Sequence, residues 1–244
     1  MSRRTLRAVL AQSRVELVLT LRRGESLVVS ILIPVGILVF FAKVDVVPTL
    51  RDPVQFLVPG VLALAVMSTA MVSLGIATGY ERRYGVLKRL GSTPLSRAGL
   101  LTAKTVSVLA LEVVQAAVLL AVGAALGWNA EGSIGAAIGL LLLGTVAFAG
   151  IGLFFAGTLR AEANLAIANA LFLGLLFLGG MAYPLNKLPG VLQTFARGLP
   201  AAALSDTVRQ ALSASPISTG ALITLIGWAI GAPLLASRTF RWEE

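Results

Sequence analysis

Residues 80–104 read YERRYGVLKRLGSTPLSRAGLLTAK and separate two long apolar runs. Residues 81–90 are long enough for about three helical turns, with apolar side chains along one side and cations around the rest. Pro94 disfavours helical backbone in the residue before it, so we expect this helix to stop within residues 91–94. The stretch therefore predicts a short, charged helix held between two membrane spans. Its apolar positions are Val86, Leu87 and Leu90.

The composition is that of an integral membrane protein. Of the 244 residues, 57% are hydrophobic and 13% are charged, whereas a soluble domain carries about 25% charged residues. The formal net charge of +9 does not indicate nucleic-acid binding, because the cations lie in short segments that flank apolar runs. The chain contains no Cys and no His, which excludes disulfides, thiol nucleophiles, imidazole bases and most zinc sites.

Six apolar runs predict an all-α fold with six transmembrane helices in a single domain, residues 26–244. Each run is close to the roughly 20 residues that a helix needs to cross the hydrocarbon core. The first run is the shortest, and Pro34 is expected to kink it. The predicted spans are residues 26–42, 54–79, 101–127, 134–157, 165–183 and 217–236.

Two segments outside these spans also have helical patterns. Residues 1–25 hold six arginines and a stripe of leucines at helical spacing, which favours an amphipathic helix on the inner membrane surface over a solvated tail. Residues 184–216 are too apolar for a solvated loop and contain two short helical patterns that separate near residues 198–200. Because irregular backbone is not tolerated in lipid, we predict a re-entrant helical hairpin in the outer leaflet, before the sixth span. Asp206 and Arg209 are spaced to pair on one helix face.

The distribution of Lys and Arg orients the chain. With six spans, 15 of the 20 cations lie in segments on the same side as residues 80–104, and five lie in the other loops. Loops rich in Lys and Arg face the cytoplasm. Both termini and the segment 80–104 are therefore predicted to be cytoplasmic, with the protein in the plasma membrane.

The order of residues in this segment resembles the signature of ABC-2 type permeases, the membrane subunits of ATP-binding-cassette exporters. The resemblance rests on Glu81-Arg82-x-x-Gly85-x-Leu87-x-x-Leu90, followed by Thr93-Pro94-Leu95-Ser96-Arg97 and Lys104. In that family the segment is a cytoplasmic coupling helix between spans 2 and 3 that docks into a groove on the ATPase subunit. Arg83 and Lys88 stand where the family often has acids, and Val86 where it often has threonine, so the docking face is more basic. The residues implied to contact the ATPase are Glu81, Arg82, Arg83, Gly85, Val86, Leu87, Lys88, Leu90, Thr93, Pro94 and Leu95.

The resemblance implies a transport subunit rather than an enzyme. It would pair with two ABC ATPase subunits and with a second permease, identical or homologous, within membrane lipid and without nucleic acid. The chain has no GxxxxGK[ST] phosphate loop, so ATP and Mg²⁺ would bind the partner ATPase and this chain would bind no cofactor. The exported substrate would be amphipathic, such as a drug, an antibiotic or a lipid. The alternative is a secondary transporter or a membrane scaffold subunit that has no ATPase partner.

Glu112 lies well inside the predicted third span, and Gln115 follows one turn later. A carboxylate at this depth is costly and usually faces a cavity or a polar partner. Two interpretations are open. Glu112 and Gln115 belong to a polar patch on the transport path with Ser68 and Thr69, or Glu112 makes a structural hydrogen bond to Ser68, Thr69 or Ser73 of the second span.

The predicted orientation can be checked by labelling single cysteines, since the chain has none of its own. Cysteines that replace outer residues are expected to react with a membrane-impermeant maleimide on intact cells, and those that replace inner residues only after permeabilisation. Labelling of position 92 from outside would contradict both the topology and the coupling role. The outer positions are Asp45, Glu131 and Asn186, and the inner positions are Ser2, Ser92 and Glu244.

Overall fold

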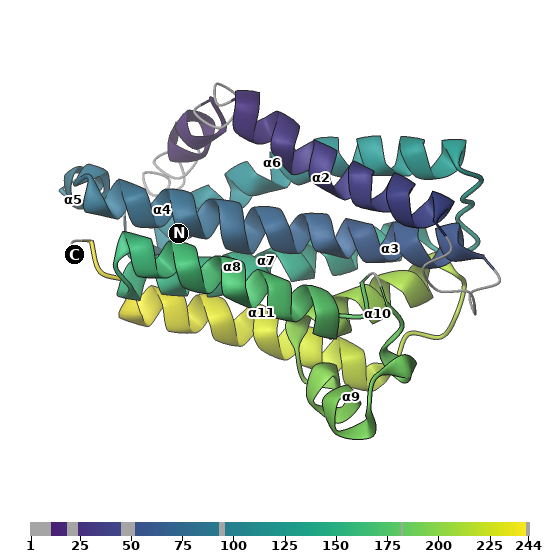
Figure 1. Cartoon of the computed structure of the whole chain (residues 1–244). Helices are drawn as coiled ribbons and strands as arrows, with labels where there is room; N and C mark the ends of the chain where they lie inside the picture. Colours follow the sequence, from purple (N-terminus) through teal and green to yellow (C-terminus); the bar gives the residue numbers. More distant parts are fainter. Residues whose placement is uncertain (1–10, 19–23, 45–51, 93–95, 182, 243–244) are drawn as a thin grey trace.

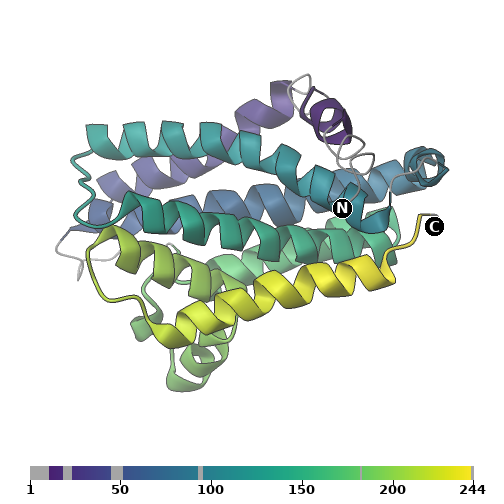
Figure 2. The same cartoon turned by 180° about the vertical axis from the view of Figure 1, so that it is seen from behind.

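The structure is a computed structural model that describes residues 11–18, 24–44, 52–92, 96–181 and 183–242. These residues form helices and no strand, which confirms the all-α prediction within the described part of the chain. The long helices run side by side in a bundle (Figures 1 and 2). After a helix at residues 11–18, the elements are α2 (Gly24–Lys43), α3 (Pro53–Val66), the π-helix η1 (Met67–Ser73), α4 (Leu74–Arg83), α5 (Val86–Gly91), α6 (Arg97–Ala125), α7 (Ile134–Thr158), α8 (Ala161–Leu178), the 3-10 helix η2 (Leu185–Lys187), α9 (Gly190–Arg197), α10 (Pro200–Leu212) and α11 (Thr219–Thr239).

Five helical stretches are long and apolar enough to cross a membrane. One of them joins α3, η1 and α4 into a continuous helix, Pro53–Arg83, and the others are α6, α7, α8 and α11. The described apolar part of α2 is shorter, Ser30–Lys43, and contains Pro34. Five of the six predicted spans are therefore confirmed as apolar helices of sufficient length, and the first, residues 26–42, stays a prediction.

Serine side chains mark where two of these spans begin. The Ser96 hydroxyl accepts a hydrogen bond from the Gly99 backbone N–H at 3.1 Å, and the Ser133 hydroxyl accepts one from Ala136 at 3.2 Å. Such N-caps satisfy amide groups that have no partner within the helix. They place the start of α6 directly after the charged segment and the start of α7 at the opposite end of the bundle (Figure 2).

Helix α7 lies in the core and packs against α11, α4, η1 and α10. Glycines allow the close approach. A Cβ on Gly152 would stand 2.4 Å from the Met71 carbonyl oxygen of η1, and one on Gly150 would stand 2.5 Å from the Pro233 nitrogen of α11. Lipid supplies little hydrophobic drive for helix association, so membrane helices gain stability from such tight van der Waals contact.

The segment 184–216 forms two helices, α9 and α10, that separate at Gly198 and Leu199, as predicted. The predicted pair also exists, with Arg209 Nη1 3.2 Å from Asp206 Oδ1. Arg209 further donates to the Gly180 carbonyl at 2.7 Å and lies 3.9 Å from the centre of the Phe56 ring. Arg209 therefore holds α10 against α3 and the end of α8, a structural role. Insertion of this hairpin into the outer leaflet stays a prediction.

The predicted N-terminal helix is confirmed over residues 11–18, and the rest of residues 1–23 lies outside the described part. Ser13 and Glu16 are buried against the bundle, while Val15 and Val18 are exposed. The polar side of this short helix thus faces the protein.

Replacing Gly152 by alanine is expected to destabilise the protein by about 1–3 kcal/mol, because the new methyl group would overlap the backbone of η1. Gly139 on the same helix has open space around its Cβ position, so Gly139→Ala is the matched control. It should leave stability unchanged or raise it, since alanine favours helix more than glycine does. Thermal unfolding in detergent, followed by tryptophan fluorescence, measures both. Equal unfolding temperatures for the two variants would contradict the packing described here.

Candidate functional site

The predicted continuous helix over residues 81–90 is wrong. Helix α4 ends at Arg83, and Gly85 adopts a left-handed backbone with φ of 72° before α5 begins at Val86. A left-handed residue cannot continue a right-handed helix, and glycine adopts this conformation without steric cost. Gly85 therefore redirects the chain, and α5 is a separate helix of six residues. The predicted contact residues Thr93, Pro94 and Leu95 lie outside the described part.

Helix α5 lies at one end of the bundle (Figure 1). Leu87 is completely buried in the core of this chain, whereas Val86 is 43% exposed and Leu90 is partly buried. The spacing of the three apolar residues suggested a single face toward a partner. The structure shows instead that they point to different surroundings. Leu87 anchors α5 to its own chain, and the exposed side carries Val86, Lys88 and Arg89.

A buried lysine joins three segments just inside this end of the bundle. Lys104 Nζ lies 2.6 Å from Glu81 Oε2 and 2.9 Å from Glu16 Oε1, and the Lys104 side chain is only 1% exposed. Glu16 belongs to the helix at residues 11–18, Glu81 to α4 and Lys104 to α6. In this Glu16–Lys104–Glu81 cluster, Glu81 pairs with a buried cation of its own chain. The cluster also places Glu81 inside the chain rather than on the surface of α5.

The neighbouring arginines fasten α4 to the turn between α7 and α8. Arg82, which is 4% exposed, donates a hydrogen bond to the Leu159 carbonyl, and Arg83 forms an ion pair with Glu162. About two helical turns deeper in α4, the Gly75 carbonyl accepts a hydrogen bond from Asn164 Nδ2 at 2.8 Å. Arg82 is therefore engaged within the chain, while Arg83 remains 44% exposed. Sequence reasoning did not single out Glu162 or Asn164, because their partners lie far away along the chain.

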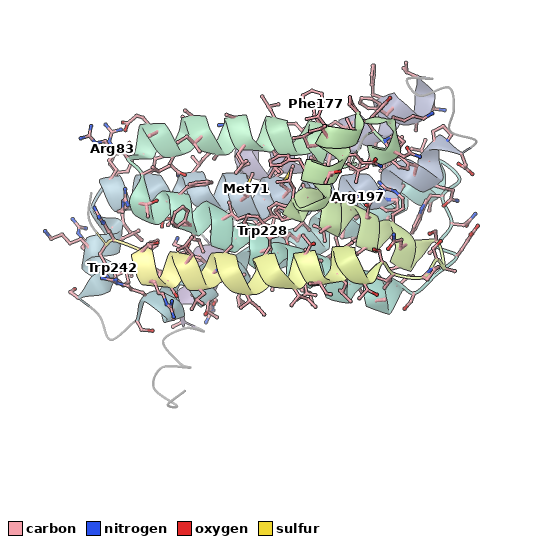
Figure 3. All side chains as sticks on the ribbon, turned by 90° about the horizontal axis from the view of Figure 1, so that it is seen from below. Met71, Arg83, Phe177, Arg197, Trp228 and Trp242 are labelled. Carbon is pink, nitrogen blue, oxygen red and sulfur yellow. The ribbon has the colours of Figure 1, made fainter. Side chains whose placement is uncertain are left out.

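The C-terminal residues reach the same end. Figure 3 shows Trp242 at the end of the molecule that also carries Arg83. The Trp242 ring lies against Gly91, the last residue of α5, where a Cβ would stand 3.2 Å from the ring. The Arg241 backbone N–H donates to the Gly157 carbonyl at 3.1 Å. The charged segment 80–92 is thus held by α6, by the α7–α8 turn and by the residues after α11.

Glu112 and Gln115 both lie in α6 and are buried, but they have different partners. The Thr145 hydroxyl of α7 hydrogen-bonds to Glu112 Oε2. The partners expected for Glu112, on the second span, are wrong. Gln115, not Glu112, bonds to the predicted second span, since Thr69 donates to Gln115 Oε1 at 3.0 Å. Gln115 Nε2 also donates to the Ser30 carbonyl of α2 at 2.9 Å. Ser68 is partly buried in η1.

Two cavities lie near these groups. A cavity of about 520 Å³ extends from Thr69 to the Glu16–Lys104–Glu81 cluster and includes Ser30 and Tyr80 in its wall. A smaller cavity of about 120 Å³ is formed by α3, α6 and α7 around Glu112 and Thr145. Thr69 therefore faces one cavity and Glu112 another. The structure does not bring the four predicted path residues together on a single path.

Within the described residues, no group of three or more His, Cys, Asp or Glu side chains is arranged to hold a metal ion. The ABC-2 type transporter family matches residues 7–213, most of the chain. This chain belongs to the ABC-2 type transporter family. It is also similar to "Putative transport permease YvfS" of Bacillus subtilis (strain 168), with 26% identity over 199 residues that cover 78% of this chain and 79% of that relative. As an ABC-2 family member it is a multi-pass membrane transport permease and is not itself an enzyme.

Lys104→Met is expected to destabilise the protein by about 3–5 kcal/mol, because it keeps the buried aliphatic stem but leaves two acids close together without the cation between them. Lys187→Met is the control, since Lys187 is exposed at the other end of the molecule. The measurement is the unfolding temperature in detergent. If both lysine variants unfold at the wild-type temperature, the Glu16–Lys104–Glu81 cluster does not hold the three segments together.

Proposed function

We propose that this chain is the permease subunit of an ABC exporter that uses ATP hydrolysed by a separate ATPase subunit. Two such ATPase subunits and a second permease, identical or homologous, complete the transporter. The substrate is amphipathic, a drug, an antibiotic or a lipid, and leaves from the inner leaflet. Membership of the ABC-2 family supports the permease role. The main observation that supports the ATPase partnership is how α5 is attached to the bundle, with one side buried and one side exposed.

Helix α5 has one side fixed to its own chain and one side exposed. Leu87 is buried, while Val86, Lys88 and Arg89 are exposed. Through Gly85, α5 continues directly into α4, whose end is tied to α6 by Lys104 and to the α7–α8 turn by Arg82. A force applied to the exposed side of α5 would therefore move several spans together. This is the mechanical property that a coupling helix needs.

The contact set proposed from the sequence divides into two roles. Glu81, Arg82 and Leu87 are positioning residues, because they are engaged inside the chain. The ATPase contacts are assigned to the exposed Arg83, Val86 and Lys88, with Gly85 supplying the turn and Leu90 at the margin. Thr93, Pro94 and Leu95 are proposed to extend the same surface. The cations on this surface fit a groove with acidic residues on the ATPase.

The orientation proposed is that of the plasma membrane with both termini in the cytoplasm. The helix at residues 11–18, α5 and the end of α11 all lie at the same end of the bundle (Figures 1 and 2). The same end carries most of the cations near the spans, which supports its placement on the cytoplasmic side. ATP is available on that side.

Docking is tested by co-expressing the chain with an ABC ATPase encoded beside it and measuring how much ATPase co-purifies. Lys88→Glu/Arg89→Glu is expected to reduce recovery on the order of tenfold or more at low salt, through repulsion from an acidic groove, and less at high salt. Both residues are exposed on α5, so the fold should persist.

The matched control is Lys43→Glu/Lys187→Glu, which reverses two exposed cations outside α5, one at the end of α2 and one in η2. It should leave co-purification and ATP turnover unchanged. Full recovery of the ATPase with the α5 variant would overturn the docking assignment. If both variants lose the ATPase equally, the loss is explained by the change in net charge and not by a contact with α5.

A further inference from the structure

The small cavity beside Glu112 differs from the rest of the transmembrane region. Its volume is about 120 Å³, and its walls come from α3, α6 and α7. The described lining is apolar except for Glu112 and Thr145, and Glu112 is its one titratable residue. The apolar lining residues are Leu62, Ala65, Val66, Leu109, Val113, Ala116, Ile138, Leu141 and Leu142.

Glu112 lines this space and has an unused acceptor. The side chain is 8% exposed, and its Oε1 has no hydrogen-bond partner among the residues that the structure describes. Its other oxygen, Oε2, is bonded to Thr145. A buried carboxylate oxygen without a partner is costly, so the arrangement favours a ligand that brings a donor.

The cavity wall indicates which donor fits. A buried water molecule typically makes about three hydrogen bonds, whereas the described lining offers only Glu112 and Thr145, which already bond to each other. A group that carries a cationic N–H on an apolar body satisfies Oε1 and fills the remaining space with carbon. Val113, Ile138 and Leu142 line the cavity and are also exposed on the outer surface of the spans, so such a group would arrive from the lipid.

We propose that Glu112, Thr145 and this cavity bind the ammonium head of a lipophilic amine that enters from the membrane. The assignment deepens the proposed function, on which it rests, by naming lipophilic amines as the substrate class. The cavity is smaller than a whole drug-sized molecule. It takes the ammonium group and the adjoining carbons, while the rest of the molecule stays in lipid.

The Thr145 hydroxyl of α7 can keep its hydrogen bonds whether the site is empty or occupied. Its single hydroxyl hydrogen can point to the Leu141 carbonyl at 3.0 Å or to Glu112 Oε2. In the empty site, a protonated Glu112 donates to Thr145, which donates to Leu141. When the neutral form of the amine enters from the lipid, it takes the carboxyl proton, Thr145 turns to donate to the carboxylate, and the resulting ammonium N–H donates to Oε1.

The test uses the full-length chain in nanodiscs of uncharged lipid, with radiolabelled para-pentylbenzylamine as the cationic probe. The neutral comparison is para-pentylbenzyl alcohol, which has the same apolar body, and empty nanodiscs give the partition background. Glu112→Gln is expected to weaken amine binding roughly tenfold to a hundredfold while changing alcohol binding less than about threefold. Glu131→Gln, an exposed acid outside the spans, is the control and should change neither.

A second variant tests the space rather than the charge. Ala116→Leu keeps Glu112 but fills the cavity, so it should weaken binding of both probes. Amine binding that survives either Glu112→Gln or Ala116→Leu overturns the proposal, and so does equal binding of the two probes to the wild type. If Glu112→Gln fails to fold, Ala116→Leu decides alone. Because binding is measured without ATP or the ATPase, its failure is separate from a failure of ATPase docking.

Discussion

The end of the bundle that carries α5 depends on one buried cation. Lys104 is almost completely buried, and a charged ammonium group is tolerated there because Glu81 and Glu16 lie within 3 Å of it. Coulombic attraction between these groups is strong away from water, but the desolvation cost is also large, so the cluster specifies an arrangement more than it adds stability. The arrangement joins the N-terminal helix, α4 and α6 at the end of α4 that leads into α5. Together with the hydrogen bond from Arg82 to Leu159, it fixes the base of α5.

A second constraint acts between the spans, where polar groups must find partners inside the protein. The π-helix η1 sits in the middle of the second span, at the level where Thr69 bonds to Gln115 and Gln115 bonds to α2. Gly152 of α7 fits directly against the backbone of η1. π-Helical turns within α-helices are frequent at functional sites, because they change the direction of the side chains that follow. Here η1 sets the rotation of α4, and hence the direction in which Glu81 and Arg82 point.

The two polar features of α6 illustrate how a helix can separate two functions. Gln115 joins α2, η1 and α6, next to the large cavity that opens toward the coupling segment. Glu112, almost one turn earlier, faces α7 and the small apolar cavity. A rotation of α6 would alter both at once. Helix α6 thus runs from Lys104, at the end of the bundle that carries α5, to Glu112 and its small cavity.

The sequence by itself determined five of the helical spans, the charged segment that separates two of them, the break between α9 and α10, and the absence of Cys and His chemistry. These follow from hydropathy, from the cations and from Gly and Pro, which act locally along the chain. Only the tertiary structure decided that Leu87 is buried while Val86 is exposed, that Glu112 bonds to Thr145 and not to the second span, and that Arg82 reaches Leu159. It also showed that Gly85 interrupts the predicted helix, since a glycine permits a left-handed turn without requiring one. Helical periodicity gives the angle between side chains on one helix, but the neighbour that each side chain meets depends on how all the helices pack together.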